Sequence, residues 1–207
     1  MTPKPDSRII LAVRARAVLR AAALGGAALA VGAWSSAAPG RERDLRAFRE
    51  GNRDRGPVAD RLLLGVTELG SIWASVGAAA VLAAAGHRRS AARGLSAAGV
   101  TWVAGQGLKR VFGRPRPYDA GLDGMHLRIG RPNGTSWPSS HPAVLQSFLT
   151  VASGDLGAGP VARAALGGLA AAIGMSRVYV GVHFPSDVAG GILLGKAVAA
   201  AFDGNRR

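Results

Sequence analysis

Three short clusters in the second half of the chain hold side chains that suit the transfer of a phosphoryl group. Together they supply three cations, two imidazoles and one carboxylate. Phosphoryl transfer spreads negative charge over three equatorial oxygens, so its catalysis depends mainly on positioning and electrostatic stabilisation. The clusters are Lys109 followed after six residues by Arg116–Pro117; Pro138–Ser139–Ser140–His141; and Ser176–Arg177 followed after five residues by His183 and after three more by Asp187.

Each residue type has a plausible part in that chemistry. Arginine forks match phosphate oxygens in pairs, and lysine adds a compact positive charge. An imidazole that attacks phosphorus must be neutral and held in one tautomer, which a neighbouring carboxylate achieves. Asp187, four residues after His183, is placed to orient it. The other imidazole, that of His141, would be protonated and would donate to the leaving oxygen.

Six apolar segments flank and separate these clusters. The first two approach the roughly 20 residues that cross a bilayer, and the last four are shorter but can be extended by snorkelling Arg and Lys at their ends. Their many small residues would let membrane helices approach closely. We therefore predict an all-α, six-helix transmembrane bundle; buried helices of a soluble all-α protein are the alternative. The segments are 21–40, 69–86, 94–108, 142–154, 164–176 and one that begins at Val188.

Alternating spans would bring the clusters to one membrane face. Lys109 follows the third segment, His141 precedes the fourth, Arg177 follows the fifth, and His183 precedes the sixth. Pro142 and Pro185 suit the first turn of a helix. Both histidines would then lie at helix N-termini, whose free N–H groups and positive dipole attract anions.

Charge predicts the orientation. The chain has 26 Lys and Arg against 12 acidic residues, a net charge of +14. By the positive-inside rule the basic arm, the second connection and the C-terminus belong to the cytoplasm, which puts the site outside. Their residues are Lys4, Arg8, Arg14, Arg16 and Arg20; Arg88, Arg89 and Arg93; and Arg206 and Arg207.

This reading divides the chain into a basic cytoplasmic arm at 1–20 and a membrane domain at 21–203. The first connection, 41–61, is equally basic, although five acids partly neutralise it, and we interpret it as an amphipathic external segment. A cleaved signal peptide with its apolar core at 21–33 is the alternative account of the N-terminus. The predicted location is a cell (plasma or inner) membrane.

The composition argues against several other kinds of site and partner. Without cysteine the chain has no disulfide, thiolate metal site or cysteine nucleophile. Its basic residues are spread between apolar stretches, with no aromatic-plus-basic surface motif, so nucleic acid is not an expected partner. His141, His183 and Asp187 could offer metal ligands, but three neighbouring cations would repel a divalent ion. We predict no metal and no cofactor, and the sequence does not indicate an oligomeric state.

The ordered clusters resemble the type 2 phosphatidic acid phosphatase superfamily, which includes vanadium haloperoxidases and bacterial class A acid phosphatases. Its pattern is a lysine, six residues and Arg-Pro; Pro-Ser-Gly-His; and Ser-Arg, five residues, His, three residues and Asp. This chain departs only at Ser140, where glycine is expected. The resemblance covers Lys109 to Asp187. Serine at that position would be strained if the turn needed a positive φ.

The resemblance implies roles for these residues. His183 would attack phosphorus to give a phosphohistidine, Asp187 would orient it, and His141 would be the general acid. The phosphoryl oxygens would be held by the side chains of Lys109, Arg116, Ser139 and Arg177 and by the backbone N–H of Ser140.

For some of these residues the sequence allows another choice of residue or a role without catalysis. Arg114–Pro115 precedes Arg116–Pro117, and only the six-residue spacing selects Arg116 over Arg114. Lys109 could be an interfacial anchor of its helix. Glu68, near the start of the second apolar segment, reads as a helix-end surface acid.

The predicted function is a metal-independent membrane phosphatase for a lipid phosphate monoester or an isoprenoid diphosphate, undecaprenyl diphosphate being one example. The alternatives are a vanadate-dependent haloperoxidase and a catalytically inactive lipid-binding membrane protein.

Overall fold

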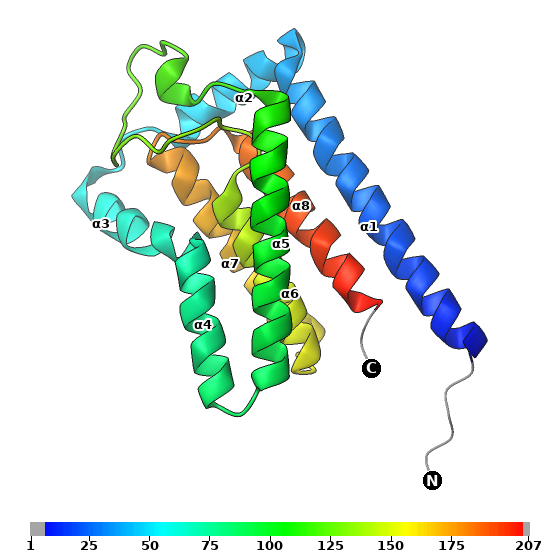
Figure 1. Ribbon diagram of the computed structural model, residues 1–207. Coiled ribbons are helices and arrows are strands. Elements are labelled where there is room, and N and C mark those ends of the chain that lie inside the picture. The colour runs from blue at the N-terminus through cyan, green and yellow to red at the C-terminus, as the bar shows by residue number, and fades with distance from the viewer. Residues whose placement is uncertain (1–6, 205–207) are drawn as a thin grey trace.

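The computed structural model describes residues 7–204, and these form helices joined by short connections and one long loop (Figure 1). No strand occurs among these residues, so the predicted all-α class is confirmed. The helices are α1 (Ser7–Ser36), α2 (Ala38–Gly51), α3 (Gly56–Thr67), α4 (Ile72–Ala84), α5 (Arg88–Phe112), α6 (Ser140–Asp155), α7 (Pro160–Tyr179) and α8 (Pro185–Asp203), with short 3-10 helices at Glu68–Gly70 and Pro117–Asp119.

The six predicted segments correspond to α1, α4, α5, α6, α7 and α8, but the first, 21–40, runs past the end of α1 into α2, and the second, 69–86, begins in the 3-10 helix and ends two residues after α4. The first connection, predicted as an amphipathic segment, supplies α2 and α3. The predicted boundary at residue 20 lies inside α1, which begins at Ser7, so the basic arm continues directly into the first helix. Lys4, Arg206 and Arg207 lie outside the described residues.

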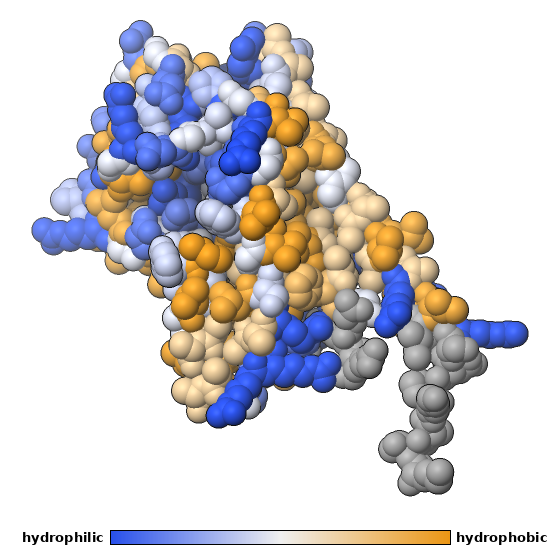
Figure 2. Space-filling view, viewed as in Figure 1, coloured by the Kyte–Doolittle hydropathy of each residue, from blue (hydrophilic) through white to orange (hydrophobic). Residues whose placement is uncertain are grey.

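Among the described residues, two helices are long and apolar enough to cross a membrane by themselves, at Leu11–Ser36 and Pro160–Tyr179. A third candidate is the pair Gly56–Gly70 and Ile72–Ala84, which is bent by 70° at a short break. Figure 2 shows a broad apolar surface between two polar ends, as expected for a bundle that lipid surrounds. A span count of six stays a prediction.

Helix α6 lies at the centre of the bundle and packs against α4, α5, α7 and α8, while α1 lies along α8. Close packing of α6 against α8 depends on glycine. A Cβ at Gly195 would lie 2.3 Å from the carbonyl oxygen of Ala143, and one at Gly191 would lie 2.3 Å from that of Ser139. The backbone of α8 therefore reaches the turn that precedes α6.

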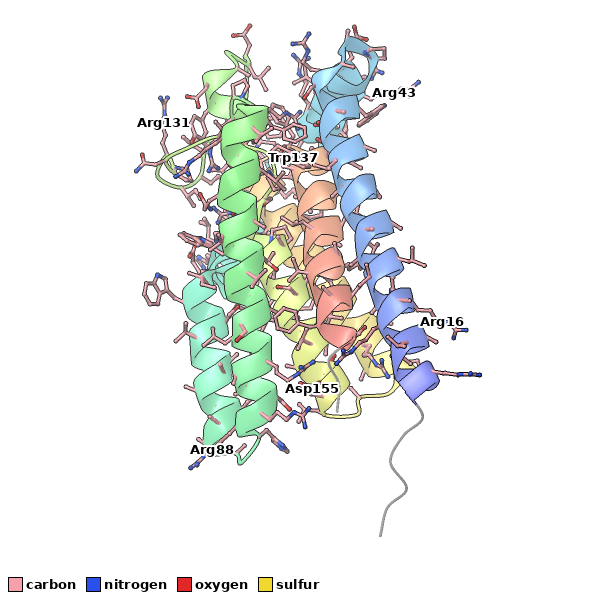
Figure 3. The ribbon with its side chains drawn as sticks, turned by 45° about the vertical axis from the view of Figure 1, so that its right-hand side comes forward. Arg16, Arg43, Arg88, Arg131, Trp137 and Asp155 are labelled. Atoms are coloured by element: carbon pink, nitrogen blue, oxygen red, sulfur yellow. The ribbon has the colours of Figure 1, made fainter. Side chains whose placement is uncertain are left out.

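The bundle has two distinct polar ends. Arg43, Arg131 and Trp137 lie at one end, and Arg16, Arg88 and Asp155 lie towards the other, where the described termini also lie (Figure 3). Basic side chains occur at both ends. Orientation by charge therefore stays a prediction.

Candidate active site

The predicted site residues all come from helix ends at the same end of the bundle. Lys109 lies in the last turn of α5 and Arg177 in the last turn of α7. Ser139 is the N-cap residue of α6, with His141 in its first turn. His183 precedes α8, and Asp187 lies in the first turn of that helix.

Asp187 orients the His183 imidazole. Its Oδ2 lies 3.3 Å from His183 Nδ1, and the backbone N–H of Phe184 donates to the same oxygen at 2.8 Å. The Ser136 hydroxyl donates to Oδ2 as well. Because Asp187 has no exposed surface, this ionised carboxylate favours a proton on Nδ1 and leaves Nε2 with its lone pair.

The free nitrogen of His183 faces the cations. Nη1 of Arg116 lies 3.4 Å from Nε2. Burial lowers the pKa of His183 from 6.5 to about 3, although the hydrogen bond and charge of Asp187 act in the opposite direction. The imidazole is therefore neutral at physiological pH, as an attacking nitrogen must be.

Arg114 and Arg116 of the doubled Arg-Pro have different positions beside the His183–Asp187 pair. Arg114 lies behind Asp187: its Nη1 donates to Asp187 Oδ1 at 2.7 Å, and its Nη2 donates to Asp44 Oδ2 at 2.6 Å. Asp44 also accepts from the backbone N–H of Ser186 at 2.9 Å. Arg116, not Arg114, lies beside Nε2 of His183.

Backbone carbonyls hold the other cations. Nζ of Lys109 donates to the Thr135 carbonyl at 2.6 Å, and Nη1 of Arg116 donates to that of Val182 at 3.0 Å. The carbonyl of Arg177 accepts from the backbone N–H of His183 at 3.3 Å. The first two bonds hold the Lys109 and Arg116 cations in place, and the third fixes the loop between α7 and α8.

Four buried polar atoms at this place have no hydrogen-bond partner: the hydroxyl oxygens of Ser139 and Ser140, Nε2 of His141 and Nε of Arg177. Such atoms are rare in folded proteins because leaving them unpaired is costly. They come from two helix ends beside Lys109 and Arg116, so an anion bound between them would satisfy the whole set.

The serine in place of the expected glycine causes no backbone strain. Ser140 is the first residue of α6, and no described residue other than glycine has a positive φ. Its N–H has no intrahelical partner, because the first N–H groups of a helix never do. The concern that serine would strain this turn is therefore removed.

Four residues beside the site were not among those predicted to form it. Asp44 and Ser136 hold the Arg114–Asp187 network, and Thr67 accepts a hydrogen bond from Nη1 of Arg177 at 3.0 Å. Glu68 Oε1 lies 3.5 Å from the same nitrogen. None of them stands in a recognisable motif, and only the fold brings them to the site.

No group of three His, Asp or Glu side chains within residues 7–204 is arranged to hold a metal ion. The described residues form an all-helical bundle with a histidine–carboxylate pair, a second histidine and several cations at one end, an arrangement suited to binding an anion.

Comparison with known proteins places the chain in a family. Residues 89–202, more than half of the chain, match the model of the PAP2 superfamily. The chain belongs to the PAP2 superfamily.

Two relatives are lipid A 1-phosphatases from Rhizobium etli and Rhizobium johnstonii, each 35% identical over 91 residues. The match covers 42% of this chain and 38% and 36% of those proteins, so the chain spans well under half of their length.

Two solved structures share the fold. A transmembrane PAP2-type phosphatidylglycerolphosphate phosphatase from Bacillus subtilis superimposes with a TM-score of 0.74 at 22% identity, over 87% of this chain and 92% of that one. Aquifex aeolicus LpxE superimposes with a TM-score of 0.67 at 29% identity, over 77% and 93%. Both support the all-helical membrane fold predicted from the apolar segments.

Proposed function

We propose that this protein is an integral membrane phosphatase that hydrolyses a lipid phosphate monoester or an isoprenoid diphosphate, without a metal, through a phosphohistidine. The observation that carries the proposal is the set of unpartnered buried donors between Arg116, His141 and Arg177. A phosphoryl group is an anion with enough acceptor oxygens to pair with them.

The first step is attack of His183 Nε2 on phosphorus. The P–N bond forms as the P–O bond to the leaving group breaks, and the leaving oxygen takes a proton from His141. Asp187 stabilises the charge that develops on the imidazole. Lys109 and Arg116, with the donors described above, stabilise the charge on the equatorial oxygens.

The second step uses water. Neutral His141 takes a proton from a water molecule that attacks phosphorus, the P–N bond breaks, and inorganic phosphate leaves with His183 neutral again. Each histidine has then returned to its starting protonation state. No oxidant, metal or cofactor takes part in this sequence.

Membrane burial supports a lipid substrate, because an amphiphile can present its phosphate at the interface without leaving the bilayer. Candidates are phosphatidic acid, phosphatidylglycerolphosphate, undecaprenyl diphosphate and, from the lipid A 1-phosphatase relatives, lipid A. We place the site on the extracytoplasmic side of a cell membrane, in a domain covering 21–203, with residues 1–20 cytoplasmic.

Detergent-purified protein should release inorganic phosphate from one of these lipids in the presence of EDTA. Vanadate should inhibit, because it mimics five-coordinate phosphorus, and His183→Ala should be inactive. Equal rates for wild type and His183→Ala would contradict the proposal, as would loss of activity in EDTA that a divalent metal restores. Halide oxidation with added vanadate would favour the haloperoxidase alternative.

The absence of cysteine gives a direct test of orientation. Asp123→Cys, exposed in the long loop at the site end, should react with an impermeant maleimide added to intact cells. His87→Cys, exposed at the opposite end between α4 and α5, is the matched control and should react only after permeabilisation. The reverse pattern would place the site in the cytoplasm.

A further inference from the structure

Glu68 lies at the elbow between α3 and α4, directly beside the site. The 3-10 helix Glu68–Gly70 makes this elbow and packs on the start of α6. A Cβ at Gly70 would lie 2.8 Å from that of His141, so no larger residue fits there without displacing the imidazole. The elbow therefore places the backbone of Glu68 next to His141, and the Glu68 side chain itself is 69% exposed.

The Glu68 carboxylate faces the second histidine. Its Oε1 lies 3.9 Å from Nε2 of His141 and 3.5 Å from Nη1 of Arg177. Thr67 holds that same Arg177 nitrogen with a hydrogen bond of 3.0 Å. At 3.9 Å the contact with His141 is electrostatic and not a hydrogen bond. Nε2 therefore stays available to donate to a leaving oxygen.

The other charges around His141 are positive. In the absence of substrate, burial and then the positive charges of Arg177 from α7, Arg116 from the long loop and Lys109 from α5 lower the pKa of His141 from 6.5 to about 3. Each opposes a proton there, whereas the general acid must carry one. Within residues 7–204, Glu68 is the one carboxylate within salt-bridge distance of His141.

We propose that Glu68 is the positioning residue of the general acid: its carboxylate favours a proton on His141 and aims that imidazole at the leaving oxygen, as Asp187 aims the imidazole of His183. The inference rests on the proposed phosphatase function and names a residue for one step of it, the transfer of the His141 proton to the leaving oxygen as the P–O bond breaks. Glu68 does not touch the phosphoryl group in this role.

The leaving group distinguishes this role from a structural one. An alkyl phosphate expels a strongly basic alkoxide and needs the proton, whereas p-nitrophenolate leaves without one. Glu68→Gln should therefore lower kcat for a short-chain phosphatidic acid by about tenfold or more. Its kcat for p-nitrophenyl phosphate should stay within about twofold of wild type, because that step needs no acid.

The pH profile gives a second readout. Without the carboxylate, His141 loses its proton at lower pH, so the alkaline limb of kcat for the alkyl substrate should move down by about one pH unit. Glu68→Asp should restore part of the rate. Glu50→Gln is the control, because it removes an exposed carboxylate of α2 whose partner is Arg53, away from the site. It should leave both rates unchanged.

Three outcomes would overturn the inference. Equal slowing of both substrates by Glu68→Gln would make the residue structural. A lower KM with unchanged kcat would mean that Glu68 competes with phosphate for Arg177. An unmoved alkaline limb would separate Glu68 from the His141 proton. If the wild-type protein releases phosphate from neither substrate, the proposed phosphatase function itself fails. That outcome is distinct from the three above, because in each of them the wild-type protein is active.

Discussion

Asp44 of α2 and Arg114, 70 residues further along the chain, form a buried ion pair with 2.6 Å between Oδ2 and Nη2. Arg114 is 8% exposed and Asp44 3%. The other arm of the guanidinium binds Asp187, so the first connection of the chain is tied through one arginine to the carboxylate that orients His183. The first connection of the chain is therefore bound to the candidate site through Arg114 and is not only a linker.

Asp44→Asn should destabilise the protein and lower its rate of phosphate release. The substitution leaves a buried guanidinium with one carboxylate and turns an amide N–H₂ towards it, and breaking a buried pair costs about 3–5 kcal/mol. We expect a lower Tm in detergent and a lower kcat with little change in KM. Glu42→Gln, on the same helix, is the control and should behave as wild type in both measurements. A normal Tm and kcat for Asp44→Asn would contradict the linkage.

Variants of Arg116 and Arg114 should differ in how tightly they bind vanadate. Arg116→Lys keeps a charge but loses the planar fork, and a hydrogen bond to a charged group contributes about 1.5–3 kcal/mol, so the inhibition constant for vanadate should rise by tenfold or more. Arg114→Lys should lower Tm and kcat while vanadate binds as tightly as to wild type. Weaker vanadate binding in Arg114→Lys alone would assign the phosphate contact to Arg114.

Ser140→Gly tests whether the departure from the family pattern matters. Ser140 is helical and unstrained, and its N–H survives in the variant. We expect a phosphatase rate within about threefold of wild type, because glycine near a cap position costs only a few tenths of a kcal/mol. A large gain in rate would mean that the Ser140 hydroxyl, which is buried and unpartnered, obstructs the substrate.

Much of the fold and site was predictable from residue spacing. Helix-compatible apolar segments locate six of the helices, and the proline that follows each histidine fits the helix start that the structure has at Ser140 and Pro185. The cluster spacing also selected Arg116 over Arg114. These features are local, so the sequence records them directly.

Contacts between distant elements could not be predicted in this way. Asp44 is one of five acids in a basic segment, and nothing in its neighbours distinguishes it from Glu42. Glu68 looked like an ordinary helix-end acid because its proximity to His141 depends on the 70° bend between α3 and α4. Such pairings arise from packing, which a single sequence does not encode in any local pattern.

His183 makes the stability of the protein depend on pH. Its pKa in the folded protein is about 3 because of burial, against 6.5 when unfolded, so the unfolded chain binds more protons between these values. Stability is therefore full above pH 6.5 and is lost as pH falls, by about 1.4 kcal/mol per pH unit for one group. Between pH 6.5 and 5 this amounts to about 2 kcal/mol.

His183→Asn removes that titration, and the comparison should be made as Tm in detergent at pH 7, 6 and 5. Wild type should lose stability more steeply than the variant across this range, whatever the two values are at pH 7. Asp187→Asn should still show the steep slope, because burial and not the carboxylate lowers the pKa of His183. Parallel slopes for wild type and His183→Asn would mean that His183 already carries a proton in the folded protein. A charged imidazole has no lone pair on Nε2 and would be unable to attack phosphorus.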